Sequence, residues 1–327
     1  MTDTATFARR TPLAGLVLEL AKARLTLLVA LTAAAGFALA QGAVIDWPGL
    51  LWCTLGTALA AGGANALNQW VEASPDGLMR RTMKRPLPSG RMTGGAALGW
   101  ALAMCAAGVA LLAGFSNLLT AALALASILI YVLAYTPMKK TTPVCTLAGA
   151  LTGAIPPLMG WTAATGGIGL GGLALFAILF VWQIPHFLAL GWLYRKDYAR
   201  AGFKMLSLED SDGRTSARLA VLYIAALVPL ALALSIFGIA GGYFAAASAL
   251  LGLAFLAAGV LLWRKRTGAA ARGVFAASIA YLFLLMVAMV GDRIPADRGA
   301  DRSAQKFIAS YNAWAAERSA PSGDEEK

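Results

Sequence analysis

Charged residues are scarce in this sequence: Asp, Glu, Lys and Arg make up 13% of its 327 residues, whereas soluble domains carry about 25%. Hydrophobic residues make up 59% of the chain, and its mean hydropathy is +0.69. A chain with so little charge has too few polar side chains to cover a soluble domain. The composition therefore excludes an ordinary soluble protein and predicts an integral membrane protein.

Cysteine and histidine are also rare. Cys53, Cys105 and Cys145 are isolated within apolar runs, which excludes a disulfide framework and a CxxC metal site. His186 is the single histidine. A cleavable signal sequence is not expected either, because Arg9 and Arg10 precede a short stretch interrupted by proline rather than a continuous apolar segment.

Acidic residues are fewer than basic ones, 16 against 27, and the net charge is +11. Such a balance is also found in proteins that bind nucleic acid. Here, however, the basic residues lie in short loops between apolar segments. We therefore expect no nucleic acid and predict two partners instead, the anionic lipids of the bilayer and an anionic substrate.

The apolar segments are long enough to cross a bilayer, which takes roughly 20 residues of helix. Their pattern predicts an all-α protein, a bundle of nine transmembrane helices. The expected spans are about 25–42, 49–70, 94–113, 116–135, 144–164, 171–193, 216–238, 243–263 and 273–291. Gly and Ala are abundant in these spans, and small residues allow helices to pack closely.

The loops between the spans alternate in charge. The loops after spans two, four, six and eight carry Lys and Arg, and the loops after spans one, three, five and seven carry none. Because cytoplasmic loops are enriched in Lys and Arg, the basic loops and the N-terminus are predicted to be cytoplasmic. The carboxylates lie mostly on the same side, so we expect the active site at the cytoplasmic mouth of the bundle.

These features predict three parts of the chain. Residues 1–24 form a cytoplasmic segment, 25–291 the nine-helix domain, and 292–327 a non-cytoplasmic tail that is partly disordered. Within the tail, Lys306 to Trp314 is expected to form a short interfacial helix, because its aromatic and aliphatic residues share one face. The expected location is the inner membrane of a bacterial cell, crossed many times.

The most polar stretch runs from Asn68 to Arg91. Asn68, Glu72 and Asp76 are spaced at i, i+4 and i+8, so a helical path places them on one face. The basic residues that follow are Arg80, Arg81, Lys84, Arg85 and Arg91. Mg²⁺ usually binds one or two carboxylates together with substrate phosphate, and Arg offers phosphate two parallel hydrogen bonds. The stretch predicts a diphosphate site; the alternative is a basic loop that only sets membrane orientation.

Two features of the fourth and fifth spans are weaker signals. Lys139 and Lys140 follow the segment Tyr135-Thr136-Pro137. They are placed to reach an anionic group, although Lys is common at cytoplasmic helix ends. Pro156 and Pro157 interrupt the backbone hydrogen bonds of the next span, which is tolerated where helices pack together or line a cavity.

The sixth span and the loop after it carry a further polar cluster. Gln183 and His186 lie within the span, where polar groups are costly and usually functional. For His186 three roles are open: an axial contact to a metalloporphyrin, a proton carrier, or a hydrogen-bonded strut. In the loop, Asp197 lies among basic residues, which repeats the composition of the first stretch or forms a solvated ion pair.

Together these clusters resemble the motifs of the UbiA superfamily of membrane prenyltransferases and, within it, of the protohaem IX farnesyltransferases. The segments that carry the resemblance are Asn68 to Arg91, Tyr135 to Lys139, Gly153 to Trp161, Trp182 to Phe187 and Asp197 to Leu206. The resemblance extends from about residue 22 to the ninth span. It implies transfer of the farnesyl group of farnesyl diphosphate to haem B, giving haem O for haem A biosynthesis. It also implies Mg²⁺ as a cofactor and makes haem A synthase, the next enzyme, a candidate partner.

The resemblance also implies roles for individual residues. The catalytic residues would be Asn68, Glu72, Asp76 and Asp197, of which Glu72, Asp76 and Asp197 would bind the metal. The diphosphate would contact Arg81, Lys84, Arg85, Lys139, Lys140, Arg195 and Lys196. The haem would contact His186, Gln183 and Trp182.

Two positions depart from the family pattern. Glu72 stands where many relatives carry Asp, and Cys145 stands where Asn is frequent. The loop near Asp197 also lacks the paired carboxylates of quinone-type relatives, since Ala201 lies four residues after Asp197. The nearest rival function is a prenyltransferase acting on a quinone precursor or a chlorin. A rival of another class is a transporter or haem-handling scaffold, which would place its site near the membrane midplane rather than at one mouth.

Overall fold

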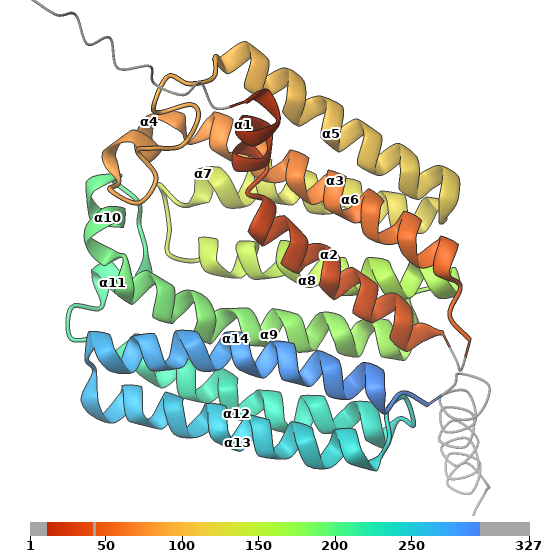
Figure 1. Cartoon of the computed structure of the whole chain (residues 1–327). Helices are drawn as coiled ribbons and strands as arrows, with labels where there is room; N and C mark the ends of the chain where they lie inside the picture. The colour runs from red at the N-terminus through yellow and green to blue at the C-terminus, as the bar shows by residue number, and fades with distance from the viewer. Residues whose placement is uncertain (1–11, 42–43, 295–327) are drawn as a thin grey trace, which may run out of the picture.

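The computed structural model describes residues 12–41 and 44–294, and these form a bundle of long helices (Figure 1). The predicted interfacial helix at Lys306–Trp314 lies outside the described residues. No strand is present in the described part of the chain, where one isolated bridge pairs Ala240 with Arg293. The helices are α1 Leu13–Leu20, α2 Ala23–Ala40, α3 Trp47–Val71, α4 Ala73–Leu78, α5 Gly94–Phe115, α6 Leu118–Leu129, α7 Thr136–Met138, α8 Cys145–Thr165, α9 Gly169–Leu193, α10 Arg195–Arg200, α11 Leu206–Glu209, α12 Arg214–Ile236, α13 Gly242–Lys265 and α14 Gly268–Gly291, with a π-helical segment, η1 Ile130–Tyr135, between α6 and α7.

Eight segments of the described chain are long and apolar enough to cross a membrane. They are α2, α3, α5, the continuous stretch Leu118–Met138, α9, α12, α13 and α14. The expected fifth span also forms a helix of suitable length, α8, but this helix is not among the eight. Its two internal prolines and its glycines and threonines lower its hydropathy. The all-α membrane fold is therefore confirmed, whereas the count of nine stays a prediction.

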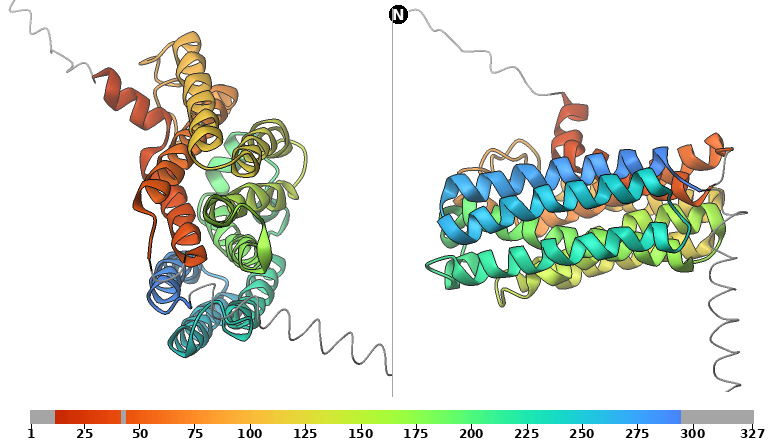
Figure 2. Two further views of the ribbon diagram at one scale, coloured as in Figure 1. Left: turned by 90° about the vertical axis from the view of Figure 1, so that its right-hand side faces the viewer. Right: turned by 90° about the horizontal axis from the view of Figure 1, so that it is seen from below.

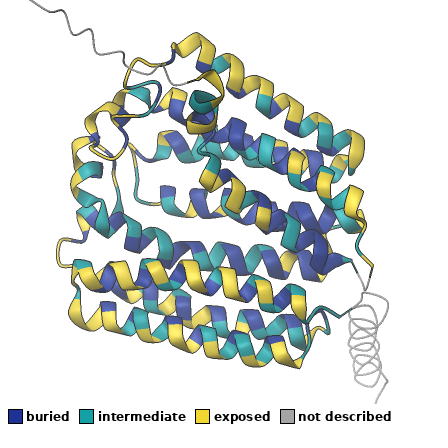
Figure 3. Cartoon of the chain, in the orientation of Figure 1, coloured by how far each residue is buried: buried dark blue, intermediate teal, exposed yellow. Residues whose placement is uncertain are grey.

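The helices pack around a central space. α2 contacts α3 and α8, α3 contacts α5, and α8 contacts α6 and α9. α12 and α13 pack with α9 and α14 into a group on one side, and α14 returns to contact both α9 and α2 (Figure 2). The outward faces of α5, α13 and α14 are exposed (Figure 3) and carry large apolar residues such as Leu250 and Phe283, as expected of surfaces that face lipid.

α2 and α8 approach each other so closely that glycine is required between them. A Cβ atom built on Gly36 would collide with the backbone of Pro157, and one built on Gly160 would collide with the backbone of Ala33. Backbone atoms cannot move aside as a side chain can, so both positions exclude larger residues. For Pro156 and Pro157 the structure shows both of the expected consequences, because Pro157 packs on α2 while Pro156 lines the central cavity.

Two interruptions of the helices shape the functional end of the bundle. α3 ends at Val71, and Glu72 (φ −93°, ψ 12°) separates it from α4, which contains Pro75 and Asp76. In η1 the backbone opens to a π-helix, a feature often found at functional sites. Its two tyrosines, Tyr131 and Tyr135, line the central cavity.

The polar clusters gather at one end of the bundle, which we call the polar end. It is formed by α1, the start of α2, α4 with the loop to α5, α7, α10 and α11, and it lies on the left in Figure 1. The structure therefore brings these polar segments together at one end of the bundle. α1 was not expected; it packs on α3 and α5 through Leu16, Val17 and Leu20.

Candidate active site

The last turn of α3 places Asn68 at the centre of the polar end. Its side chain is almost fully buried, and its amide nitrogen donates to Thr136 Oγ1 at 3.1 Å. Its amide oxygen accepts from Lys22 Nζ at 2.8 Å. Asn68 therefore connects three separate segments, the start of α2, the end of α3 and the start of α7.

Glu72 follows one turn later and forms a buried ion pair with Lys139. The Lys139 Nζ atom lies 2.8 Å from Glu72 Oε1 and donates to Oε2 at 3.1 Å. It also lies over the rings of Tyr135 and Phe203, 4.5 and 5.6 Å from their centroids. Burial by itself lowers the pKa of Lys139, but the Glu72 carboxylate and the nearby Tyr131 and Tyr198 together outweigh it and raise that pKa above its usual value. Lys139 is thus held as a cation beside a buried carboxylate.

Asp76, on α4, is fully buried and pairs with Arg85. Arg85 Nη1 lies 2.6 Å from Asp76 Oδ2, and Thr82 Oγ1 donates to the Asp76 backbone carbonyl at 2.8 Å. The other carboxylate oxygen, Asp76 Oδ1, is buried and has no hydrogen-bond partner among the described residues. An unpartnered buried carboxylate oxygen is costly, so this atom is suited to a cation that arrives with the ligand.

Lys22 is a site residue that was not predicted from the sequence. Its backbone is in the left-handed region (φ 51°), which non-glycine residues seldom adopt, and its side chain reaches into the site to Asn68. Burial, together with the positive charges of Arg85 and Lys139, lowers the pKa of Lys22 to about 7. In the sequence, a lysine just before the first span indicates only the orientation of the chain in the membrane. The turn between α1 and α2 is what directs the Lys22 side chain into the site.

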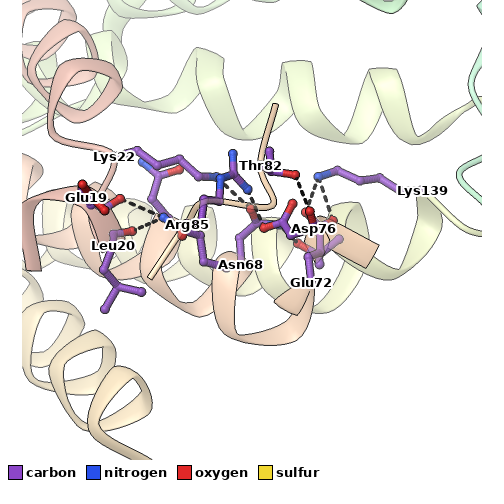
Figure 4. A network of polar contacts seen from close by, with 12 residues as sticks. Glu19, Leu20, Lys22, Asn68, Glu72, Asp76, Thr82, Arg85 and Lys139 are labelled. Atoms are coloured by element: carbon purple, nitrogen blue, oxygen red, sulfur yellow. Dashed lines mark hydrogen bonds and ion pairs between the residues drawn. The ribbon is translucent and has the colours of Figure 1, made fainter. Parts of the chain in front are cut away.

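These side chains surround the mouth of a cavity of about 340 Å³ that extends between the helices. In Figure 4 the cations Lys22, Arg85 and Lys139 approach the site from both sides of the acidic residues. The polar lining at the mouth comprises Lys22, Asn68, Glu72, Asp76, Arg81, Arg85, Lys139 and Tyr198. The apolar part is lined by residues that include Leu25, Val29, Ala60, Ala61, Ala64, Ala124, Ile128 and Met159. The cavity is therefore charged at one end and mostly apolar over the rest of its wall.

The α9 cluster borders the same cavity. Gln183, His186 and Phe187 line it, and Trp182 lies beside His186 without lining it. Gln183 Nε2 donates to the backbone carbonyls of Ala150 and Leu179, at 3.3 and 3.2 Å. Gln183 and His186 therefore line the same cavity as Asn68, Glu72 and Asp76.

The loop after α9 is placed differently. Asp197, Arg195 and Lys196 line a neighbouring pocket of about 360 Å³ rather than the central cavity. Asp197 pairs with Arg200 at 2.9 Å and accepts from the backbone of Arg80 at 3.4 Å. Since successive residues of a helix point in different directions, the next residue, Tyr198, faces the central cavity instead.

Two more of the predicted diphosphate contacts do not line the central cavity. Lys84 and Lys140 are exposed, and Arg91 Nη2 donates to the backbone carbonyl of Lys84. Arg91 also pairs with Glu19 of α1 at 2.6 Å, which ties the loop to the N-terminal helix. Arg81, by contrast, lines the cavity and lies 4.8 Å from the centre of the Tyr194 ring.

The residues present suit a divalent metal that arrives with a phosphate ligand. The described residues contain no group of three His, Cys, Asp or Glu side chains that could hold a metal by themselves. The expected set of Glu72, Asp76 and Asp197 is divided, since Asp197 lines the other pocket. Mg²⁺ usually needs only one or two carboxylates, with water and substrate phosphate as its other ligands, and the free oxygen of Asp76 offers one of them.

The departures from the family pattern have structural counterparts. The side chain of Glu72 reaches Lys139, so the carboxylate at this position is engaged by a cation of the chain itself. Cys145 is buried at the start of α8, where its sulfur lies 4.0 Å from that of Met205. The thiol at this position therefore packs against the sulfur of Met205, which lies in the loop between α10 and α11.

Comparison with known proteins agrees with this architecture. The chain is 46% identical to a protoheme IX farnesyltransferase of Anaeromyxobacter sp. (strain Fw109-5) over 84% of this chain and 92% of that protein. It is 43% identical to a mitochondrial protoheme IX farnesyltransferase of Arabidopsis thaliana over 85% of this chain; the match spans 65% of the length of that relative.

Solved structures with little sequence identity share the fold. A digeranylgeranylglyceryl phosphate synthase superimposes with a TM-score of 0.73 at 18% identity, covering 85% of this chain and 98% of the other. A UbiA homologue from Archaeoglobus fulgidus, bound to GPP and Mg²⁺, superimposes with a TM-score of 0.63 at 15% identity, covering 84% and 99%. The UbiA prenyltransferase family itself matches residues 29–287. This chain therefore belongs to the UbiA prenyltransferase family.

Proposed function

We propose that this protein transfers the farnesyl group of farnesyl diphosphate to a vinyl group of haem B, with addition of water, and releases haem O and diphosphate. The relatives that it resembles over most of its length are named protoheme IX farnesyltransferases. Haem O is the precursor from which haem A is made, which makes haem A synthase a candidate partner.

The observation that carries the proposal is the division of the central cavity into a charged mouth and an apolar shaft. A prenyl diphosphate has the same division, with an anionic head on a long apolar chain. The head would lie among Lys22, Arg81, Arg85 and Lys139, and the chain would lie along the small side chains of α3 and α6. A small soluble anion would leave the apolar part of the cavity unused. An uncharged lipid would leave the charged residues at the mouth without a ligand.

Mg²⁺ is the proposed cofactor. Asp76 and Glu72 would hold it together with the diphosphate, because Asp76 Oδ1 is buried without a partner and Glu72 is buried and lines the same cavity. When bound, the metal neutralises charge that develops on the leaving diphosphate. The A. fulgidus homologue with this fold was solved with GPP and Mg²⁺. Five predicted contacts lie outside the central cavity and remain predictions: Asp197, Arg195 and Lys196, which line the neighbouring pocket, and the exposed Lys84 and Lys140.

The chain's own residues favour breaking the allylic C–O bond. Arg85 and Lys139 are fixed in place by ion pairs, so they stabilise the departing diphosphate without reorganising. The rings of Tyr131, Tyr135 and Phe187 line the cavity and can stabilise the allylic cation through their faces. The porphyrin vinyl carbon then attacks the farnesyl carbon, and water adds to the resulting cation and releases a proton.

Three features of the setting belong to the same proposal. α8 also crosses the membrane, as the fifth of nine spans, since it packs between α2 and α9 and is 21 residues long. The polar end and the N-terminus face the cytoplasm, because the loops rich in Lys and Arg lie at the polar end and such loops are usually cytoplasmic. The protein resides in the inner membrane of a bacterium, with the three parts of the chain divided at about residues 24 and 291.

The decisive experiment incubates the purified protein with farnesyl diphosphate, haem B and Mg²⁺ and measures both diphosphate release and haem O by mass spectrometry. Asp76→Asn, which keeps the shape of the side chain and removes its charge, is expected to abolish both products while the protein stays folded. Full activity of this variant would contradict the assignment of the diphosphate site. Diphosphate release without haem O would point to another acceptor, such as a quinone precursor, and binding without release would indicate a transporter.

A further inference from the structure

The imidazole ring of His186 is held in one orientation by α14, a helix that carries none of the family motifs. It stacks on Phe275 of α14 with ring centroids 4.8 Å apart, and on Trp182 of its own helix at 5.0 Å. The Trp182 Nε1 atom donates to the backbone carbonyl of Ser278 at 2.7 Å, which ties the two helices together at this level. The ring is therefore enclosed by aromatic side chains and presents its edges to polar partners.

The hydrogen bonds around Ser278 determine which ring nitrogen carries the proton. Ser278 Oγ lies 2.6 Å from the backbone carbonyl of Phe275 and 2.7 Å from His186 Nδ1. A carbonyl oxygen can only accept, so the single hydroxyl proton of Ser278 points to Phe275. The Ser278 oxygen must then accept from His186, and Nδ1 bears a hydrogen.

The other nitrogen of the ring is left available. In a neutral imidazole with hydrogen on Nδ1, Nε2 carries a lone pair. It has no hydrogen-bond partner in the described part of the chain, and His186 lines the central cavity. The neighbouring Gln183 does not compete for it, since its amide group donates to two backbone carbonyls.

We propose that Ser278 is a positioning residue, which orients His186 so that its Nε2 lone pair binds the iron of the porphyrin substrate in the central cavity. This inference rests on the proposed function, because it requires haem B as the acceptor. Histidines that bind a metal almost always donate their other N–H to an oxygen, which orients the ring and makes it a stronger ligand. Ser278 supplies that oxygen, and the two aromatic rings prevent the imidazole from turning away.

The test compares His186→Asn, Ser278→Ala and Ser278→Thr in the purified full-length protein. An asparagine amide reaches the position of Nδ1 and can donate to Ser278, but it places nothing at Nε2. His186→Asn is therefore the matched control that preserves a strut and removes a ligand. Ser278→Thr keeps an oxygen acceptor, whereas Ser278→Ala removes it.

Haem B binding is measured by the Soret band, and the iron–histidine stretching band is recorded by resonance Raman in the ferrous complex. We expect His186→Asn to lose that band and to bind haem B much more weakly, with unchanged affinity for farnesyl diphosphate. Ser278→Ala should shift the band and weaken haem binding by about 10-fold or more, and Ser278→Thr should restore both.

The outcomes separate this inference from the function on which it rests. A wild-type haem spectrum in His186→Asn, or an unshifted band and unchanged haem affinity in Ser278→Ala, would overturn the inference alone. A wild-type protein that binds farnesyl diphosphate but no haem B would overturn the proposed acceptor, and the inference with it. Equal loss of haem and farnesyl diphosphate binding in both variants would show that His186 and Ser278 are structural.

Discussion

Removing one partner of the Glu72–Lys139 ion pair is expected to destabilise the protein more than removing both. The side chains are only 5% and 10% exposed, and Nζ lies 2.8 Å from the carboxylate. Losing one member of such a buried pair leaves the other charge uncompensated, at a cost of about 3–5 kcal/mol. Glu72→Gln and Lys139→Met should each lower the free energy of unfolding by that amount, and the double variant by clearly less than their sum.

The measurement is equilibrium unfolding in mixed detergent micelles, with activity assayed in parallel. Arg91→Met is the matched control, because the Arg91–Glu19 pair is 34% and 48% exposed and should contribute no more than about 1 kcal/mol. All three variants of the buried pair should lose activity, since each alters the proposed diphosphate site. If the single costs add within about 0.5 kcal/mol, the two charges are not coupled and the reasoning fails.

The remaining predictions concern packing, proton uptake and the metal. Gly160→Ala should destabilise the protein by about 1–3 kcal/mol through the clash with the α2 backbone, whereas Gly114→Ala, where nothing lies within 4 Å, should have no such cost in the same unfolding assay. Because the pKa of Lys22 is about 7 in the free site and a bound diphosphate raises it, binding should take up a proton above pH 7 and weaken as the pH rises; calorimetry in buffers of different ionisation enthalpy should show this uptake in the wild type and its loss in Lys22→Met. Chelation of Mg²⁺ should abolish diphosphate release but leave haem B binding intact, and activity that survives chelation would contradict the metal proposal.

Several features of this protein could be derived from the sequence because they depend on local composition. Apolar runs of about 20 residues can satisfy their backbone in a bilayer only as helices, so the all-α membrane fold and most span positions follow directly. Asn68, Glu72 and Asp76 share a helical face by spacing alone, and the alternation of basic and neutral loops predicts that they lie on the same side of the membrane as the other basic loops. Pro75 also favours the break in the helix at Glu72, because proline disrupts the helical turn that precedes it.

The tertiary structure alone decided which charged residues meet. Lys22 lies in the site because the left-handed backbone at this residue directs its side chain there. Asp197 lies outside the site because α10 directs its carboxylate toward Arg200. Ser278 reaches His186 from a helix that is 92 residues away in sequence. Such contacts depend on the direction in which each helix approaches its neighbours, and that direction is set by packing between distant segments, not by the composition of any one of them.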